Sequence, residues 1–406
     1  MFARLRRAKE EYPSQFWLLF WGMLISTVGT SMIWPFLMIY VSEKLKLPLS
    51  TVATLMTVNA ISGLIFSFIA GPVADFIGRK RIMVFSLITD GLAFLLLSQA
   101  ASYPAFLVLM ALRGAINPLY RVGADAMMAD LVEPEKRADA YSLLRMSNNI
   151  GVAVGPSVGG FIAGVSYNLA FFFAAIGMIT YGVLITIQAR ETMPQRQEKR
   201  QPERFAGYGR VLGDRPFIQF VLAFLLTSIV ASMVWVLLSV YAKQNYHVPE
   251  SQYGFIATTN ALMVVFLQFS VTQVTKRHSP LPVMAIGALF YAVGGASIAL
   301  GRGFWGFWMS MVIMTIGELI MTPTGSTFVA NRAPADMRGR YMSLYGLTHS
   351  LAYGIGPLLG GFINDNIAPV AIWYGAGIIG LASVLAFAVL TLRQRRAQTT
   401  PAPQAG

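Results

Sequence analysis

Two stretches of the sequence, RADAYSLLRMSNNIGVAVGPSVGGFI at 137–162 and RGRYMSLYGLTHSLAYGIGPLLGGFI at 338–363, decide the fold. They lie 201 residues apart, and nine identities fall in register. In the first stretch these are Arg137, Ser142, Leu143, Gly155, Pro156, Gly159, Gly160, Phe161 and Ile162. The same offset relates TSMIWPFLMIY at 30–40 to ASMVWVLLSVY at 231–241. A constant offset over separate segments indicates an internal duplication, so two halves of similar architecture are predicted.

The composition places most of this architecture in lipid. Hydrophobic residues make up 55% of the 406 residues and charged residues only 12%, whereas soluble domains have about 25% charged residues. Apolar runs long enough to cross a bilayer recur twelve times, and each is expected to be a helix because no alternating barrel pattern is present. The predicted spans are 15–41, 50–70, 82–102, 104–129, 139–166, 168–189, 216–242, 251–275, 281–301, 304–330, 339–364 and 368–392. The sequence therefore predicts an all-α membrane protein with twelve transmembrane helices in two pseudo-symmetric six-helix bundles.

The basic residues predict the orientation of these helices. With the N-terminus in the cytoplasm, 24 of the 31 Lys and Arg residues fall in cytoplasmic segments and four in external loops. Such a bias is typical of polytopic membrane proteins, and it predicts that both termini are cytoplasmic. It also accounts for the net charge of +13 without a nucleic-acid partner. We expect a multi-pass protein of the cytoplasmic (inner) membrane, whose first apolar run is retained as a membrane helix.

One hydrophilic stretch separates the two halves. RETMPQRQEKRQPERFAGYGR at 190–210 has the charged, Pro- and Gln-containing composition of a linker. The predicted domains are an N-terminal bundle at 1–190, a cytoplasmic linker at 191–215, a C-terminal bundle at 216–393 and a cytoplasmic tail at 394–406. The sequence has no cysteine and three scattered histidines, so no metal site is expected.

The loop after the second span carries GPVADFIGRKR at 71–81. Gly71 and Gly78 would permit a tight turn and close helix approach, Asp75 could accept hydrogen bonds from a helix N-terminus, and Arg79 could pair with a carboxylate. The alternative is that the basic residues only set topology. The string resembles the G-x-x-x-D-x-x-G-R-K/R signature of the major facilitator superfamily. This resemblance covers essentially the whole chain and implies two bundles that rock about a central cavity. It also implies a conformational latch between Arg79 and Asp130, while VTQVTKRHSPL at 271–281 has lost the acidic and glycine positions.

A glycine motif recurs in the fifth and eleventh spans. Gly151, Gly155 and Gly159 lie on one helix face, where a missing side chain lets another helix approach. The element resembles the G-x-x-x-G-P-x-x-G-G motif of the family's twelve-helix drug:proton antiporters, and generic small-residue packing is the alternative. The expected packing motif comprises Gly151, Gly155, Pro156, Gly159, Gly160, Gly356, Pro357, Gly360 and Gly361.

Three charged residues at membrane depth are candidates for proton coupling. A charge there is costly, so a functional or paired role is the default expectation. Glu318 falls near the middle of the tenth span, where a carboxyl group could exchange a proton when water or a cation reaches it. Arg113 resembles a buried arginine implicated in proton handling in the drug exporters, although the usual G-x-G after it is absent. Asp90 is expected near the depth of Arg121, and this pair is interpreted mainly as structural, with Asp125 a competing partner for Arg121.

Five side chains are candidates for the substrate cavity. Trp34 and Trp235 could stack against an apolar or cationic substrate, and a membrane-interface aromatic belt is the alternative. Asn59 and Asn260 fall nearer the middle of their helices, and Asn117 lies close to Arg113.

The sequence predicts a secondary transporter rather than an enzyme. We expect a monomer that exports small amphipathic or drug-like molecules by proton antiport and needs no cofactor, because the proton gradient supplies the energy and no phosphate-binding loop is present. The alternatives are a proton-coupled symporter, a specific exporter of a sugar, metabolite or lipid, and a membrane sensor that does not transport.

Overall fold

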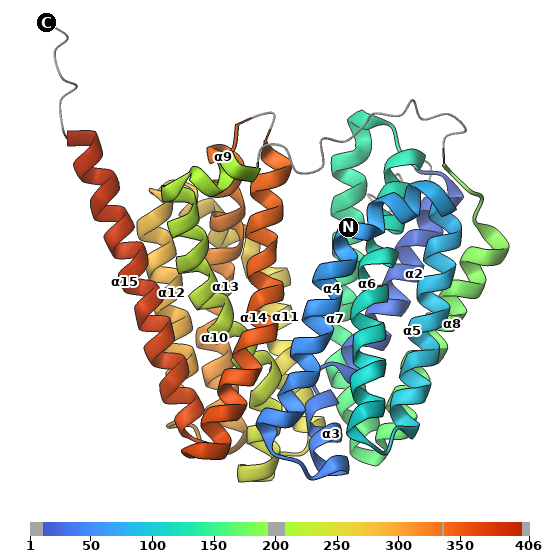
Figure 1. Cartoon of the computed structure of the whole chain (residues 1–406), viewed down its shortest axis with the longest axis horizontal. Coiled ribbons are helices and arrows are strands. Elements are labelled where there is room, and N and C mark those ends of the chain that lie inside the picture. Colours follow the sequence, from blue (N-terminus) through green and yellow to red (C-terminus); the bar gives the residue numbers. More distant parts are fainter. Residues whose placement is uncertain (1–10, 194–207, 335–336, 400–406) are drawn as a thin grey trace, which may run out of the picture. The chain divides into compact units, whose positions relative to one another are not determined.

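The structure, a computed structural model, describes residues 11–193, 208–334 and 337–399, and it is helical with no strand in these ranges. The first half contains α2 (Ser14–Ile33), α3 (Leu37–Leu45), α4 (Leu49–Ile77), α5 (Arg79–Gln99), α6 (Tyr103–Leu131), η1 (Pro134–Lys136), α7 (Arg137–Val165) and α8 (Tyr167–Gln188). The second half contains α9 (Tyr208–Gly213), α10 (Arg215–Tyr246), α11 (Glu250–Thr275), α12 (Pro280–Ser297), α13 (Gly303–Arg332), α14 (Arg338–Asn366) and α15 (Ala371–Thr399). Figure 1 shows the long helices of each half running alongside one another.

The described helices fit the twelve predicted spans. Ten segments are long and apolar enough to cross a membrane. In this count α2 and α3 form a single span, and the break between them at residues 34–36 contains Pro35. Proline lacks the backbone N–H that an uninterrupted helix needs. The other two spans are α7 and α14, of 29 residues each. Their many glycine, serine, asparagine and histidine residues lower their hydropathy, which is why length rather than apolarity identifies them.

Contacts divide the chain into two compact units. Unit 1 comprises Met1–Arg200 and Ser239–Ala261, and unit 2 comprises Gln201–Leu238 and Leu262–Gly406. The repeat is visible within them, since α5 packs on α6 and α8 in unit 1 as α12 packs on α13 and α15 in unit 2. Most of the predicted linker, 194–207, lies outside the described residues. Three described residues of unit 1 have positive φ: Gly78 (φ 104°) separates α4 from α5, Lys46 (φ 52°) ends α3, and His247 (φ 56°) follows α10.

The segment 239–261, from the second sequence repeat, packs within unit 1. A side chain at Gly254 would collide with the Pro156 carbonyl, and one at Gly160 would collide with the Glu250 carbonyl. The Glu250 carboxylate, which is buried, accepts hydrogen bonds from Lys243 at 2.6 Å and from the Tyr167 hydroxyl at 2.5 Å. The contact-based units therefore differ from the predicted division at the linker, because parts of α10 and α11 belong to unit 1.

The glycine motif is a close-packing surface with two faces. On one face, a Cβ at Gly151 would lie 2.7 Å from Thr27 Cβ and one at Gly155 would lie 2.5 Å from Ser31 Cβ, while one at Gly159 would meet the Met32 backbone. The sequence predicts that another helix approaches this face, and the structure identifies that helix as α2. Gly160 points instead to α11, as described above. In unit 2, Gly356 and Gly360 repeat the first face by packing on Ser232 and Leu237 of α10, and the motif's Pro357 and Gly361 are buried in α14.

This packing gives a steric prediction with an internal control. Gly159→Ala is expected to lower the free energy of unfolding by about 1–3 kcal/mol, because the added methyl group must displace the α2 backbone. Gly164→Ala, in the same helix, is expected to be neutral or mildly stabilising, because no atom lies within 4 Å of the Cβ position. Thermal unfolding of the purified proteins in detergent measures both. Equal melting temperatures for the two variants would contradict the packing role.

Candidate functional site

A cavity of about 140 Å³ lies within unit 2 and contains two of the predicted residues, Glu318 and Trp235. Its walls come from α10, α12, α13 and α14. Aromatic side chains line these walls together with hydroxyl groups and a single carboxyl group. The lining residues are Phe224, Thr227, Ser228, Ala231, Trp235, Tyr291, Glu318, Met321, Thr322, His349 and Tyr353. We call this the unit 2 cavity. A carboxyl group surrounded by aromatic rings can neutralise a cationic ligand or hold a proton in its place.

The backbone beside Glu318 is held by a hydrogen bond from another helix. Pro323 lies inside α13 and has no N–H to bond the Leu319 carbonyl, four residues earlier. The Gln268 side-chain amide of α11 donates to that carbonyl at 2.9 Å instead. The helix therefore continues past the proline, and the turn that bears Glu318 is anchored to α11. The sequence analysis did not identify Gln268, although a proline four residues after a helical position signals a carbonyl that needs another donor.

Among the residues of this cavity that the sequence analysis did not identify are two on α14 and one on α12. His349 and Tyr353 lie one turn apart on α14, and Tyr291 comes from α12. The ring of His349 packs edge-to-face against Phe224 and Tyr345. The available signal was the four-residue spacing of His349 and Tyr353, which places both on one helix face.

A second cavity, of about 250 Å³, lies within unit 1 and has a different character. Hydroxyl, amide and charged side chains predominate among its lining residues, which include the predicted Asp90 and Asn117. We call this the unit 1 cavity. Its polar lining residues are Ser26, Thr27, Thr30, Ser31, Ser86, Asp90, Asn117, Tyr120, Arg121, Asp125 and Asn148.

The two cavities occupy equivalent positions in the repeat. Subtracting 201 from the numbers of nine residues of the unit 2 cavity gives residues that line the unit 1 cavity. The chemistry has diverged at several pairs: Glu318 corresponds to Asn117, His349 to Asn148 and Tyr291 to Asp90. The remaining pairs are Phe224 with Met23, Thr227 with Ser26, Ser228 with Thr27, Ala231 with Thr30, Met321 with Tyr120 and Thr322 with Arg121. The two repeats thus contain equivalent cavities, and the side chains that line these cavities differ in charge.

Asp90 pairs with Arg113, and not with Arg121 as the depth count predicted. The Arg113 Nε lies 2.7 Å from Asp90 Oδ1, and the Arg113 Nη2 lies 3.5 Å from Oδ2. Both side chains are buried, at 8% and 9% exposure, and the guanidinium stacks on the Phe94 ring at 3.9 Å. Two of the three proton-coupling candidates therefore form one buried ion pair, while Glu318 belongs to the other unit.

The predicted latch pair forms within unit 1. Arg79 Nε lies 3.2 Å from Asp130 Oδ2, and Arg79 Nη2 lies 3.3 Å from Asp75 Oδ1. Glu191, which the sequence analysis missed, accepts hydrogen bonds from the backbone amides of Arg79 (3.0 Å) and Lys80 (3.1 Å) at the start of α5. Glu191 thus does for the α5 N-terminus what was expected of Asp75, whose side chain is 56% exposed.

Gly71 does not have the expected role. It lies inside α4, and no atom lies within 4 Å of its Cβ position, so it makes neither a turn nor a close helix contact. Gly78 has the conformation that the motif predicts, with φ at 104°, and a side chain there would collide with Glu191.

The remaining cavity candidates lie elsewhere. The Asn59 amide donates to the Met110 carbonyl at 3.0 Å, which joins α4 to α6 and is a packing role. Asn260 is buried in the part of α11 that belongs to unit 1. Trp34 lies at the break between α2 and α3. None of these three lines either cavity.

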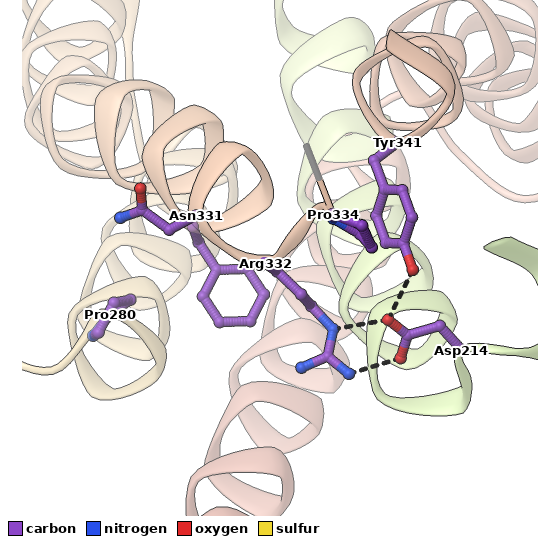
Figure 2. Close-up of a pocket in the computed structure, with 7 residues that line it drawn as sticks. Asp214, Pro280, Asn331, Arg332, Pro334 and Tyr341 are labelled. Atoms are coloured by element: carbon purple, nitrogen blue, oxygen red, sulfur yellow. Dashed lines mark hydrogen bonds and ion pairs between the residues drawn. The ribbon is translucent and has the colours of Figure 1, made fainter. Parts of the chain in front are cut away.

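Unit 2 has a third pocket, of about 440 Å³, where the repeat would place a second latch (Figure 2). Pro280 and Asn331 line it, and they correspond to Arg79 and Asp130. The end of α13 is held by a different pair: Arg332 Nε lies 2.9 Å from Asp214 Oδ2, and the Tyr341 hydroxyl donates to the same oxygen at 3.0 Å. The loss of the latch charges in the second half is thus accompanied by a new anchor.

The Asp214 anchor gives a pH-dependent prediction. Burial alone would raise the pKa of Asp214, but hydrogen bonds from Arg332, the Phe217 amide and Tyr341, with the Arg332 charge, hold the pKa below its ordinary value of 3.8. A lowered pKa stabilises the fold above the unfolded-state pKa, and this contribution is lost as the pH falls through the folded-state pKa. Asp214→Asn is therefore expected to lower the free energy of unfolding by about 1 kcal/mol at pH 7, and by progressively less below about pH 4. Thermal unfolding against pH measures this difference, with the exposed Glu135→Gln as control. A difference that did not change with pH would contradict the carboxylate's role.

Comparison with known proteins places these features in a family context. The family model described as Major Facilitator Superfamily matches residues 19–244 and 220–406. A Na(+), Li(+), K(+)/H(+) antiporter of Planococcus maritimus is 26% identical over 390 residues, which cover 87% of this chain and 89% of that protein. The quinolone resistance protein NorA of Staphylococcus aureus is 22% identical over 377 residues, covering 91% and 96%. Among solved structures, the nucleoside transporter NupG matches with a TM-score of 0.81 at 12% identity, covering 92% and 99%, and so is similar in fold alone.

Proposed function

The chain belongs to the Major Facilitator Superfamily, and from that premise we propose that it is a proton-coupled antiporter that exports small amphipathic, drug-like molecules by alternating access. The observation that carries this proposal is the position of Glu318. It lines the unit 2 cavity together with Trp235, Tyr291 and Tyr353. A single carboxyl group in such a cavity can be occupied either by a proton or by a cationic group of a substrate. Exclusive occupancy of this kind is what antiport requires.

The aromatic walls support the proposed substrate class. Rings of Trp and Tyr offer apolar area and a negative face to which an organic cation is attracted. The relative named as a quinolone resistance protein supports drug-like compounds as the first to test. The hydroxyl groups of Thr227, Ser228 and Thr322 on the same walls can bind the polar groups of such compounds.

An alkali-metal cation is a second candidate substrate. It is favoured by one observation, the similarity to a Na(+), Li(+), K(+)/H(+) antiporter over most of both chains. No group of three or more His, Cys, Asp or Glu side chains suited to a metal ion occurs in the part of the chain that the structure describes. Hydroxyl and amide oxygens of the unit 1 cavity would then have to supply most ligands.

One experiment separates these substrates. The purified full-length protein is reconstituted into vesicles that contain a pH-sensitive dye and carry an outwardly or inwardly directed proton gradient. Proton movement opposite to norfloxacin or ethidium supports drug antiport, and proton movement opposite to Na⁺, Li⁺ or K⁺ supports the second candidate. Movement of proton and solute in the same direction would replace antiport with symport. Solute movement that is independent of any proton gradient would refute proton coupling.

The proposal includes further expectations about orientation, location, oligomeric state and cofactors. The distribution of Lys and Arg supports cytoplasmic termini in the cytoplasmic membrane. A monomer with no cofactor suffices, since the cavity of each unit is formed by that unit alone and the proton gradient supplies the energy.

A further inference from the structure

The unit 1 cavity contains a cationic side chain that its own surroundings leave uncompensated at close range. Two arginines of α6 are close to this cavity. Arg113 forms an ion pair with Asp90. Arg121 makes no hydrogen bond and no ion pair within 4 Å in the ranges that the structure describes, although it lines the cavity. Asp125, one turn along α6, interacts with it only electrostatically and not by direct contact. Arg121 is exposed and lines the cavity, so its guanidinium is accessible to a ligand there.

Hydrogen-bond donors surround this arginine. The Thr27 hydroxyl donates to Asn148 Oδ1 at 3.2 Å, which orients the two amide N–H groups of Asn148 away from Thr27. Asn117, one turn before Arg121, also lines the cavity. Five guanidinium N–H groups and two side-chain amides thus belong to one cavity wall, on α6 and α7. Such a wall fits a ligand group that only accepts hydrogen bonds.

The equivalent wall in unit 2 has the opposite character. The three positions Asn117, Arg121 and Asn148 correspond to Glu318, Thr322 and His349. The donor-rich set therefore occurs in one copy of a duplicated cavity and not in the other. Helix packing common to both repeats cannot explain this difference, because both cavities are built on the same helix framework.

We propose that the unit 1 cavity binds the carboxylate group of a substrate, with Arg121 as its main ligand and Asn117 and Asn148 as additional donors. The planar fork of Arg121 can bond both carboxylate oxygens. Asp125 competes with the incoming carboxylate for the electrostatic interaction with Arg121. Identifying this group as part of a transported substrate rests on the proposed transport function. The binding of a carboxylate does not.

The absence of cysteine from the chain makes a direct binding test possible. Thr30 lines the unit 1 cavity, and Ala231 is its equivalent in unit 2. Each is replaced separately by cysteine in the purified full-length protein, and labelling by the neutral reagent N-ethylmaleimide is timed with benzoate or with its neutral isostere benzamide. At about twice its dissociation constant, benzoate is expected to slow labelling of the Thr30→Cys protein about threefold. Benzamide is expected to have no effect, and benzoate is expected not to protect the Ala231→Cys protein.

Second variants in the Thr30→Cys background identify the ligand. Arg121→Gln is expected to abolish protection by benzoate, Arg121→Lys to weaken it, and Asp125→Asn to strengthen it. Equal protection by benzamide, protection that persists in Arg121→Gln, or no protection at any soluble benzoate concentration would each overturn the proposal. The assay uses no proton gradient and no transport, and Glu318→Gln should leave protection unchanged. Failure of proton coupling and failure of carboxylate binding are therefore separate outcomes.

Discussion

Glu318→Gln is expected to reduce proton-driven transport more than about 100-fold while leaving the protein folded. The amide keeps the size of the carboxyl group but can neither take up a proton nor balance a cation. A 100-fold loss corresponds to about 2.7 kcal/mol, which is modest for removal of the only acidic group that lines the unit 2 cavity. The measurement is substrate-dependent proton flux into vesicles, normalised to the amount of reconstituted protein.

The control for this variant separates coupling from cavity shape. Exchange of substrate in the absence of any proton gradient should continue at a reduced rate for a neutral test compound, because the aromatic walls remain. The exposed Glu135→Gln should behave as the unmodified protein in both assays. Full proton-driven transport by Glu318→Gln would show that the coupling group lies elsewhere. Asp90 and Arg113 would then be the remaining candidates.

The position of Glu318 was predictable from the sequence because helix depth is simple to count. In a helix that crosses the bilayer, rise per residue is fixed, so a residue about fourteen positions from the end lies near the middle. Trp235 was predicted as a cavity residue for its capacity to stack against a substrate, and the structure puts both Glu318 and Trp235 in one cavity. The glycine motif was predictable for a similar reason, since spacing by four puts residues on one face.

Depth alone did not give the partner of Asp90. Arg113 and Arg121 are eight residues apart on α6, so their side chains leave the helix axis in directions about 80° apart. Which of them faces α5 depends on the rotation of α6, and a depth count contains no information on rotation. A signal was present nonetheless. Phe94 lies one turn after Asp90, and this pairing of a carboxylate with an aromatic ring on one helix face is what the Arg113 guanidinium contacts.

Residues that satisfy backbone groups of a distant helix were the least predictable. Glu191 bonds the first amides of α5, and Gln268 bonds the carbonyl that Pro323 leaves without a donor. The sequence shows that these backbone groups need a partner. Only the packing of the helices shows which side chain is near enough to supply it.

Asp90 and Arg113 allow the last prediction, which compares a broken ion pair with an absent one. Arg113→Met alone is expected to lower the free energy of unfolding by about 3–5 kcal/mol, because Asp90 would be left buried without its partner. The repeat supplies a matched replacement: the positions equivalent to Asp90 and Arg113 in unit 2 hold Tyr291 and Met314, both buried. The double variant Asp90→Tyr with Arg113→Met, which removes both charges together, should recover most of the stability.

Transport by that double variant then decides what the pair is for. If the pair only stabilises unit 1, the folded double variant should retain proton-driven transport within about threefold, since Glu318 is untouched. If the pair participates in coupling, the double variant should be stable but should exchange substrate without moving protons. A double variant less stable than Arg113→Met would contradict the premise that the two charges compensate each other. It would also show that the space around Asp90 cannot accept a tyrosine ring, although the second repeat has tyrosine at the equivalent position. Thermal unfolding and proton flux, measured on the same preparation, distinguish these outcomes.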